Sequence, residues 1–360
     1  MVYPITLIPG DGVGPEVTEA ARRVLEATGV NFQWDIHHIG IKAQDTMGTL
    51  LPESVLESIR QNKVALKGPV TTPVGSGFRS VNVTLRNKLE LYSCLRPCKT
   101  YTGAPSLHKD VDIIIVRENM EDLYSGIEFE KGAPETTRLI EMISEAKQTA
   151  VSADSGISIK VISEMGSKRI VKFAFEYART HNRKRVTAVH KANIMKFSDG
   201  LFLFIAREIA KEYPDIEFED RIIDNMTMQM VQKPYQFDIV VTTNLYGDIL
   251  SDLCAGLIGG LGLAPGANLS NEIAVFEATH GSAPKYEGLN KANPMAMMLS
   301  GVMMLRHIGE GKCADNLETA ISEVIAEGNN VTYDLKPESP DDAVGTSQVA
   351  DAVIEKLKNN

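Results

Sequence analysis

Short runs of β-branched and apolar residues alternate with longer stretches of helical periodicity along most of the chain. The runs at 3–8, 63–67, 112–116, 185–189 and 238–242 are typical of buried strands. The stretches at 15–27, 170–180, 200–212, 293–307 and 314–327 are typical of helices, the first of them with Pro15 in its first turn. This alternation predicts an α/β fold.

The chain is long for a single hydrophobic core, because it has 360 residues. We therefore expect two domains, or one domain with a large insertion. The formal net charge of −10 argues against a nucleic-acid partner, since an acidic surface repels phosphates. No apolar run is long enough to span a membrane and the first residues carry no basic secretion signal, so we expect a soluble, cytoplasmic protein.

The four cysteines are too scattered to form a zinc quartet, and buried, reduced thiols are expected. Cys94 and Cys98 are spaced to face one side of a helix. Residues 122–163 differ from their surroundings: they are polar, with short alternating pieces such as 156–161 that resemble strands. This segment predicts a surface hairpin or an arm that pairs with another subunit.

The glycine-rich run at 10–14 follows the first predicted strand, but its spacing is GxGxG rather than GxGxxG. No acidic residue stands clearly at the end of a second strand to bind a ribose. We interpret the run as a tight turn between strand and helix. Residues 71–77 and 259–268 form further loops rich in Gly and Pro, and no phosphate-binding P-loop is present.

Arginine residues recur at positions that suit an anion site. Arg86 follows Ser80 and Asn82, Arg96 follows a short interval later, and Arg117 stands at the end of a predicted strand. Ligands of open α/β sheets collect at such carboxyl ends. Three converging guanidiniums would bind a substrate with several carboxylates, whereas the alternative is three unrelated surface arginines.

Asp248 and Asp252 lie one helical turn apart after the strand at 238–242. Two carboxylates on one helix face repel unless a cation lies between them, and oxygen ligands suit Mg²⁺ or Mn²⁺. The alternative is a helix-terminal carboxylate with a solvated neighbour. Lys191, after the strand at 185–189, is a candidate base, and Tyr124 is a candidate proton donor; either residue could instead be a surface or packing side chain.

Taken in order, several segments resemble the β-decarboxylating dehydrogenases, the family of isocitrate, isopropylmalate, homoisocitrate and tartrate dehydrogenases. The matching segments are IPGDGVGPE, TTPVGSGFRSVNVTLR, LRP, RENMEDLY, HKANIMK, NLYGDILSD, GGLGLAPGAN and EATHGSAPKY. The resemblance implies a two-domain α/β subunit of non-Rossmann type. Residues 1–92 and 257–360 would form the large domain and 93–256 the small domain, with 122–163 as an arm that clasps a second subunit in a homodimer.

The resemblance also implies roles for individual residues. Ser80 and Asn82 resemble the pattern of members that act on isocitrate, so isocitrate would be bound by Ser80, Asn82, Arg86, Arg96 and Arg117. Mg²⁺ or Mn²⁺ would be held by Asp248 and Asp252 together with Asp224 from the partner chain. Lys191, also from the partner chain, would deprotonate the substrate hydroxyl, and Tyr124 would protonate the enol carbon.

The adenosine side of the cofactor would lie on a loop that the resemblance assigns to Thr71, His280, Gly281, Ser282, Ala283, Pro284, Lys285, Tyr286, Asn293 and Tyr333. NAD-selective members place an acidic residue where this chain has Lys285, so NADP is expected and NAD is the alternative. Pro337, where many NADP enzymes have a second cation, weakens that expectation, although Lys336 adjoins it. A sister dehydrogenase, such as one acting on homoisocitrate, and a non-catalytic regulatory subunit are the competing hypotheses for the chain as a whole.

Overall fold

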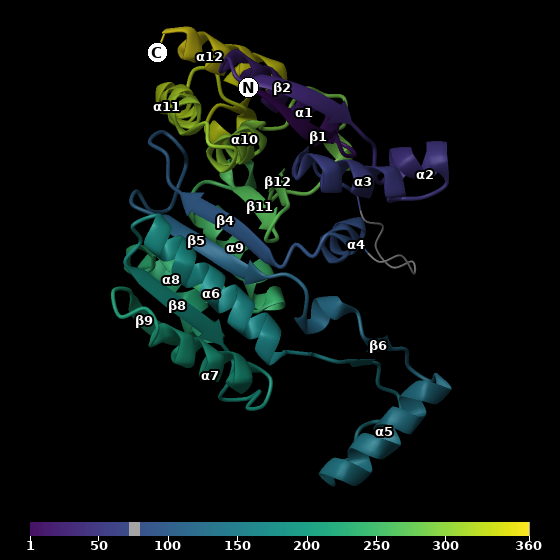
Figure 1. Ribbon diagram of the computed structural model, residues 1–360. Helices are drawn as coiled ribbons and strands as arrows, with labels where there is room; N and C mark the ends of the chain where they lie inside the picture. Colours follow the sequence, from purple (N-terminus) through teal and green to yellow (C-terminus); the bar gives the residue numbers. More distant parts are fainter. Residues whose placement is uncertain (72–79, 360) are drawn as a thin grey trace.

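The computed structural model describes residues 1–71 and 80–359. One sheet of ten strands runs through the molecule in the order β2-β1-β3-β12-β11-β4-β5-β10-β8-β9 (Figure 1). Its strands are β1 Val2–Ile8, β2 Asn31–Ile36, β3 Val64–Lys67, β4 Ser93–Lys99, β5 Asp112–Glu118, β8 Arg185–His190, β9 Glu217–Ile222, β10 Ile239–Thr242, β11 Pro265–Leu269 and β12 Ala274–Ala278. The α/β class expected from the sequence is confirmed.

Helices cover both faces of this sheet (Figure 1). They are α1 Gly14–Ala27, α2 Ile41–Met47, α3 Glu53–Asn62, α4 Val81–Lys88, α5 Pro134–Lys147, α6 Glu164–Thr180, α7 Asp199–Ala210, α8 Ile223–Gln232, α9 Asn244–Leu257, α10 Met295–His307, α11 Gly311–Glu327 and α12 Thr346–Asn359. Helices α1, α10, α11 and α12 pack together at the end that holds both chain termini, whereas α6 and α7 lie in front of the other half of the sheet, with α8 and α9 behind it.

All five expected strands are present, as β1, β3, β5, β8 and β10, and all five expected helices are present. Helix α6 begins earlier than expected, at Glu164, because the Ser163 hydroxyl accepts a hydrogen bond from the backbone N–H of Gly166 at 2.9 Å and caps the helix. The part of the chain that the structure describes contains no helix long and apolar enough to cross a bilayer.

Two sequence-based expectations are met only in part. The strands expected within residues 122–163 are limited to a two-residue ladder of β6 Glu128–Phe129 and β7 Ile157–Ser158, and between them lies the 14-residue helix α5, which was not expected. This segment projects from the body of the molecule (Figure 1). Cys94 and Cys98 lie on strand β4, where residues four apart also share a face, and both are buried.

Strand direction determines which loops meet. Strands β1, β3 and β12 are parallel, as are β5, β10, β8 and β9, while β11 is antiparallel to both of its neighbours. Three antiparallel pairings separate the two sets, so the loops after β1, β3 and β12 lie at one edge of the sheet and the loops after β5, β10, β8 and β9 lie at the opposite edge. The five strands from β2 to β11 come from residues 1–92 and 257–360, and the other five come from 93–256. The division into two domains at these boundaries stays a prediction.

Candidate active site

Several candidate residues from 93–256 lie at or just after the carboxyl ends of the parallel strands β5, β8, β9 and β10. Arg117 is the penultimate residue of β5, Lys191 directly follows β8, and α9, with Asp248, begins just after β10. Asp224 lies in the first turn of α8, after β9. The strand order therefore brings together residues that are more than a hundred positions apart in the sequence.

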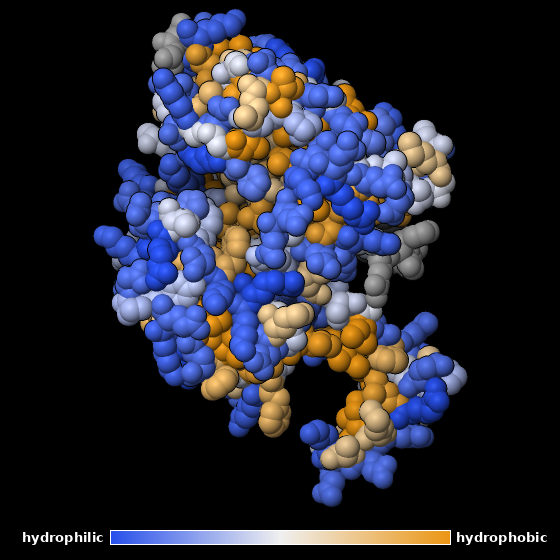
Figure 2. Space-filling view, in the orientation of Figure 1, coloured by the Kyte–Doolittle hydropathy of each residue, from blue (hydrophilic) through white to orange (hydrophobic). Residues whose placement is uncertain are grey.

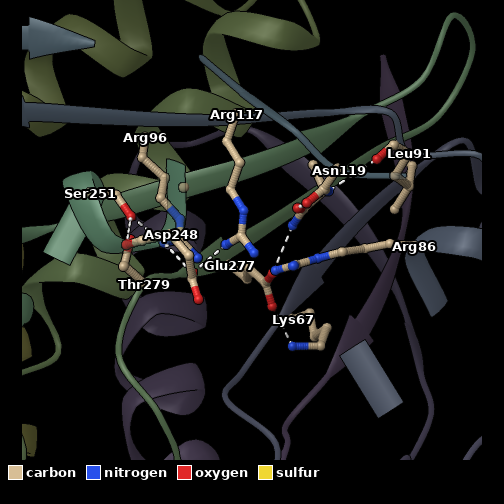
Figure 3. A network of polar contacts seen from close by, with 12 residues as sticks. Lys67, Arg86, Leu91, Arg96, Arg117, Asn119, Asp248, Ser251, Glu277 and Thr279 are labelled. Carbon is tan, nitrogen blue, oxygen red and sulfur yellow. Dashed lines mark hydrogen bonds and ion pairs between the residues drawn. The ribbon is translucent and has the colours of Figure 1, made fainter. Parts of the chain in front are cut away.

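Asp248 is the centre of one polar network (Figure 3). It forms an ion pair with the fully buried Arg117, and a hydrogen bond of 3.3 Å from Arg96 Nη1. The Tyr124 hydroxyl donates a hydrogen bond to Asp248 Oδ2 at 2.5 Å, and the Arg117 guanidinium carbon lies 4.8 Å from the Tyr124 ring centroid. Ser251, one turn further along α9, accepts from Arg96 Nη1 at 2.5 Å.

The charges of this network shift the pKa values of its members. Burial, reinforced by the charges of Arg96 and Arg86, lowers the pKa of Arg117, so three guanidiniums influence one another. Burial acts to raise the pKa of the Asp248 carboxyl, but Arg117 and Arg96 outweigh it and the pKa is lowered. Burial and the hydrogen bond to Asp248 raise the pKa of Tyr124, which keeps its hydroxyl protonated.

A second network lies around Glu277, in β12 (Figure 3). Glu277 accepts hydrogen bonds from Arg86 Nη2 at 3.0 Å and Asn268 Nδ2 at 2.7 Å, and it forms an ion pair with Lys67. Burial opposes ionisation, but Lys67 and Arg86 lower the pKa of Glu277. Neither Glu277 nor Lys67 was predicted from the sequence. A charged residue within each of two apolar strands, VALK and AVFEA, was the available signal.

Several buried polar atoms near these networks lack a hydrogen-bond partner among residues 1–71 and 80–359. They are Asn82 Oδ1, Arg86 Nε and Arg117 Nη2. Asn82 lies on α4, the helix that also carries Arg86, and Ser80 directly precedes this helix. Buried polar atoms are rarely left unsatisfied, so this group suits a ligand that carries several oxygen acceptors and at least one donor.

Of the two candidate metal ligands on α9, Asp252 is more exposed than Asp248, with 61% of its side chain accessible, and it lies 4.0 Å from Arg96 Nη1. Partial burial raises the pKa of Asp252, and the charge of Asp248 adds to it against the opposing effect of Arg96. Asp224 is not part of this pair: it forms an ion pair with Lys191. In the described part of the chain, no three His, Cys, Asp or Glu side chains are grouped so that they could hold a metal ion.

The glycine turn after β1 packs against the loop after β12. The Val13 N–H donates to the Ser282 carbonyl at 2.9 Å, and a Cβ on Gly12 would lie 2.1 Å from that same oxygen. Thr71 Oγ1 is 2.7 Å from Ser282 Oγ. The turn is therefore glycine-rich because another backbone crosses it closely. Most of the Gly/Pro-rich loop at 71–77 lies outside the described residues.

The remaining candidate cofactor residues fall on and beside this loop. The Tyr286 and Tyr333 rings lie 6.0 Å apart, with Lys285 Nζ 4.8 Å from the first ring and Lys291 Nζ 4.9 Å from the second. Ala283 has a φ of 38°, in the left-handed region that side chains disfavour. His280, Gly281, Ser282 and Pro284 belong to the same loop as Lys285, and the side-chain amide of Asn293 donates a hydrogen bond to Asp334, next to Tyr333, at 2.9 Å.

A cavity of about 590 Å³ lies away from these networks. Leu95, Pro97 and Lys99 line it, whereas Arg96, between them on β4, points to α9. Alternate residues of a strand face opposite sides of the sheet, so the cavity and the candidate site occupy opposite faces. Its charged groups are paired with one another, as in the ion pair of Lys99 with Glu318.

The chain is similar to known proteins over nearly its whole length. A model of the isocitrate/isopropylmalate dehydrogenase family matches residues 4–353. A mitochondrial catalytic subunit of NAD isocitrate dehydrogenase from Arabidopsis thaliana is 46% identical over 92% of this chain and 83% of its own length. The chloroplastic 3-isopropylmalate dehydrogenase of Solanum tuberosum is 46% identical over 90% of this chain and 85% of its own length.

An NADP isocitrate dehydrogenase from Thermus thermophilus is 44% identical over 98% of this chain and 67% of its own length. The crystal structure of isocitrate dehydrogenase from Methylococcus capsulatus superposes with a TM-score of 0.91 at 51% identity, covering 99% of both chains. The chain belongs to the isocitrate/isopropylmalate dehydrogenase family.

Proposed function

We propose that this protein catalyses the oxidative decarboxylation of isocitrate to 2-oxoglutarate and CO₂, with NADP preferred over NAD as the hydride acceptor. The observation that carries the proposal is the group of buried polar atoms on Arg86, Arg117 and Asn82 that have no hydrogen-bond partner among the described residues. Guanidinium forks bind carboxylates, and isocitrate carries three of them.

The substrate choice rests on Ser80 and Asn82. In the isopropylmalate-type alternative an isopropyl group would lie where isocitrate has a carboxylate. The Ser80 hydroxyl and the Asn82 amide N–H, which could donate hydrogen bonds to that carboxylate, would then face an apolar group, and leaving a buried polar group unmatched costs about 1–3 kcal/mol. A homoisocitrate-type enzyme is the nearer competitor, because its substrate keeps all three carboxylates.

The donor set fits a divalent metal. Asp248 and Asp252 offer only oxygen ligands, one turn apart on α9, and burial followed by the charge of Asp248 raises the pKa of Asp252. A Mg²⁺ or Mn²⁺ ion held there would polarise the substrate oxygen, and the nicotinamide would accept the hydride.

The side chains of this protein would transfer the protons. Lys191 would take the proton of the substrate hydroxyl as the alcohol is oxidised to a ketone. Loss of CO₂ from that β-keto acid leaves an enol, and the Tyr124 hydroxyl would give its proton to the enol carbon. The raised pKa of Tyr124 suits this role, because the group stays protonated at neutral pH.

We further propose that each active site is assembled from two copies of the chain. Lys191 and Asp224 pair with each other and are not grouped with Asp248 and Asp252. Large hydrophobic side chains are exposed on α7, α8 and α9, as in Phe204, Met228, Val231 and Ile249. Hydrophobic residues are also exposed on the projecting segment (Figure 2), among them Ile127, Met142 and Val161. A second copy would cover both surfaces.

The NADP preference is supported by the cations beside the Tyr286–Tyr333 pair. Lys285 and Lys291 both lie near these rings, where a 2′-phosphate could be bound. Lys336 contributes less, because its ammonium already donates to the carbonyls of Asn329 and Asp342 at 2.9 and 3.0 Å.

The proposal is tested by a substrate and cofactor matrix on the purified chain with Mg²⁺. Isocitrate, homoisocitrate and 3-isopropylmalate are each assayed with NAD and with NADP. We expect the highest kcat/KM for isocitrate with NADP. Preferred turnover of another substrate would identify a sister dehydrogenase, and a strong preference for NAD would refute the cofactor assignment. No turnover at all would support the alternative of a non-catalytic regulatory subunit. The presence of both Tyr124 and Lys191, the proposed catalytic residues, argues against that alternative.

A further inference from the structure

A buried charge cluster lies at the base of the projecting segment. It consists of Lys160 with Asp122 and Asp199, whose side chains have no exposed surface. Lys160 Nζ lies 2.9 Å from Asp199 Oδ1 and 3.4 Å from Asp122 Oδ1. Among the described residues, Lys160 is the cation that forms ion pairs with both carboxylates, so its removal would leave two buried negative charges without a counter-charge.

Asp122 connects this cluster to Tyr124 and to α9. It is the first residue of the short 3₁₀ helix Asp122–Ser125, which contains Tyr124. Its carboxylate accepts hydrogen bonds from the N–H groups of Leu123 and Leu245, each at 2.9 Å. Leu245 lies in the first turn of the helix that carries Asp248. Asp122 also has a φ of 69°, a conformation that costs energy in a residue other than glycine and persists only where its surroundings hold it.

Asp199 connects the cluster to Lys191. Its Oδ2 accepts a hydrogen bond from the Lys191 backbone N–H at 2.6 Å, which fixes the chain where it leaves β8. Lys160 Nζ lies 4.5 Å from the ring centroid of Tyr246, two residues before Asp248. One ammonium therefore contacts the segments that position Tyr124, Lys191 and Asp248.

We propose that Lys160 is a positioning residue that holds Tyr124 and Lys191 in register with the metal helix α9. This inference rests on the proposed function. In a dimer with shared sites, Tyr124 serves the site of its own chain and Lys191 serves the other site, so the cluster links the two sites. Lys160 pairs with Asp122 and Asp199 rather than with the candidate substrate-binding residues, so we expect its loss to affect proton transfer rather than substrate binding.

The first test is steady-state kinetics of Lys160→Met and Lys160→Arg. A displacement of about 1 Å of a proton-transferring group costs up to about a hundredfold in rate. We expect kcat to fall by about tenfold to a hundredfold in Lys160→Met, with KM for isocitrate changed less than about threefold, and Lys160→Arg to recover most of kcat. The matched control is Lys168→Met, because Lys168 is 56% exposed and pairs with Glu164 on the surface. It should behave as the wild type.

A second variant separates positioning from folding. Lys160→Met combined with Asp122→Asn restores the net charge of the cluster, and asparagine tolerates the left-handed conformation at position 122. We expect this variant to fold with low kcat and with faster hydrogen exchange at the amides of Lys191 and Leu245. A folded double variant with wild-type kcat and wild-type exchange would overturn the proposal. Hydrogen exchange can be measured without turnover. A wild-type protein that is inactive on isocitrate would therefore refute the proposed function, while the exchange measurement would still test the role of Lys160.

Discussion

Gly247 permits the contact between α9 and the most buried arginine of the candidate site. A Cβ at this position would lie 2.5 Å from Arg117 Cγ and 2.6 Å from Arg117 Cβ, whereas ordinary contacts begin at 3.4 Å. The atoms it meets are the root of a fully buried side chain, which cannot swing away as a flexible end would. Gly247→Ala should therefore displace Arg117 by about 1 Å.

Two opposing energies determine the effect on stability. Alanine is favoured over glycine inside a helix by about 1 kcal/mol, and overpacking a rigid site costs about 1–3 kcal/mol. The free energy of unfolding should therefore fall by only about 0–2 kcal/mol. Function should suffer more, because a hydrogen bond to a charged group is worth about 1.5–3 kcal/mol, which corresponds to about a tenfold to 150-fold loss in kcat/KM for isocitrate.

The assay compares Gly247→Ala with Gly256→Ala. Gly256 lies in the same helix, and a Cβ there would meet no atom of the described residues within 4 Å. The control should keep wild-type kinetics with equal or slightly higher stability. Isocitrate kinetics and denaturant unfolding are measured on both variants. A Gly247→Ala enzyme with wild-type kcat/KM would refute the claim that Arg117, in its present position, binds the substrate.

Three further predictions concern the cofactor, the shared site and pH. Lys285→Asp should lower kcat/KM with NADP by at least about tenfold while NAD kinetics are retained, as the ratio of the two values reports. Lys191→Met and Asp248→Asn should each be inactive. When the two variants are mixed and reassociated, about a quarter of wild-type activity should return, because half of the dimers are hybrids and each hybrid has one intact site. No recovery of activity would contradict a shared site. Burial raises the pKa of Glu118 to about 7, from 4.5, so folding favours its protonated form. The contribution of Glu118 to the free energy of unfolding is present below pH 4.5 and is lost as the pH rises through about 7. In the wild type this free energy should therefore fall by up to about 3 kcal/mol over that pH range, and Glu118→Gln should lack this part of the fall. Denaturant unfolding at several pH values measures the difference.

Features that depend on local pattern could be predicted from the sequence. The buried strands are short apolar runs, and Arg117, Lys191 and Asp248 follow such runs, so their gathering at one edge of the sheet could be expected. The resemblance to a family added the roles that spacing alone leaves open.

Features that depend on distant pairing could not be predicted in this way. Lys67 and Glu277 meet because β3 pairs with β12, and this pairing could not be predicted because 210 positions separate the two residues in the sequence. Helix α5 was missed because it buries only Thr136 and Ile140, so its apolar stripe is weak. The junction of Lys160 with two aspartates likewise depends on the path of the segment back to the body of the protein.

The activity proposed for this site is the oxidation and decarboxylation of isocitrate. The most direct measurement incubates the purified protein with Mg²⁺, isocitrate and NADP, and in parallel with NAD, and quantifies every product. We expect equal amounts of reduced cofactor, CO₂ and 2-oxoglutarate. Failure to turn over isocitrate with either cofactor, or reduction of the cofactor without release of CO₂, would contradict the proposed activity.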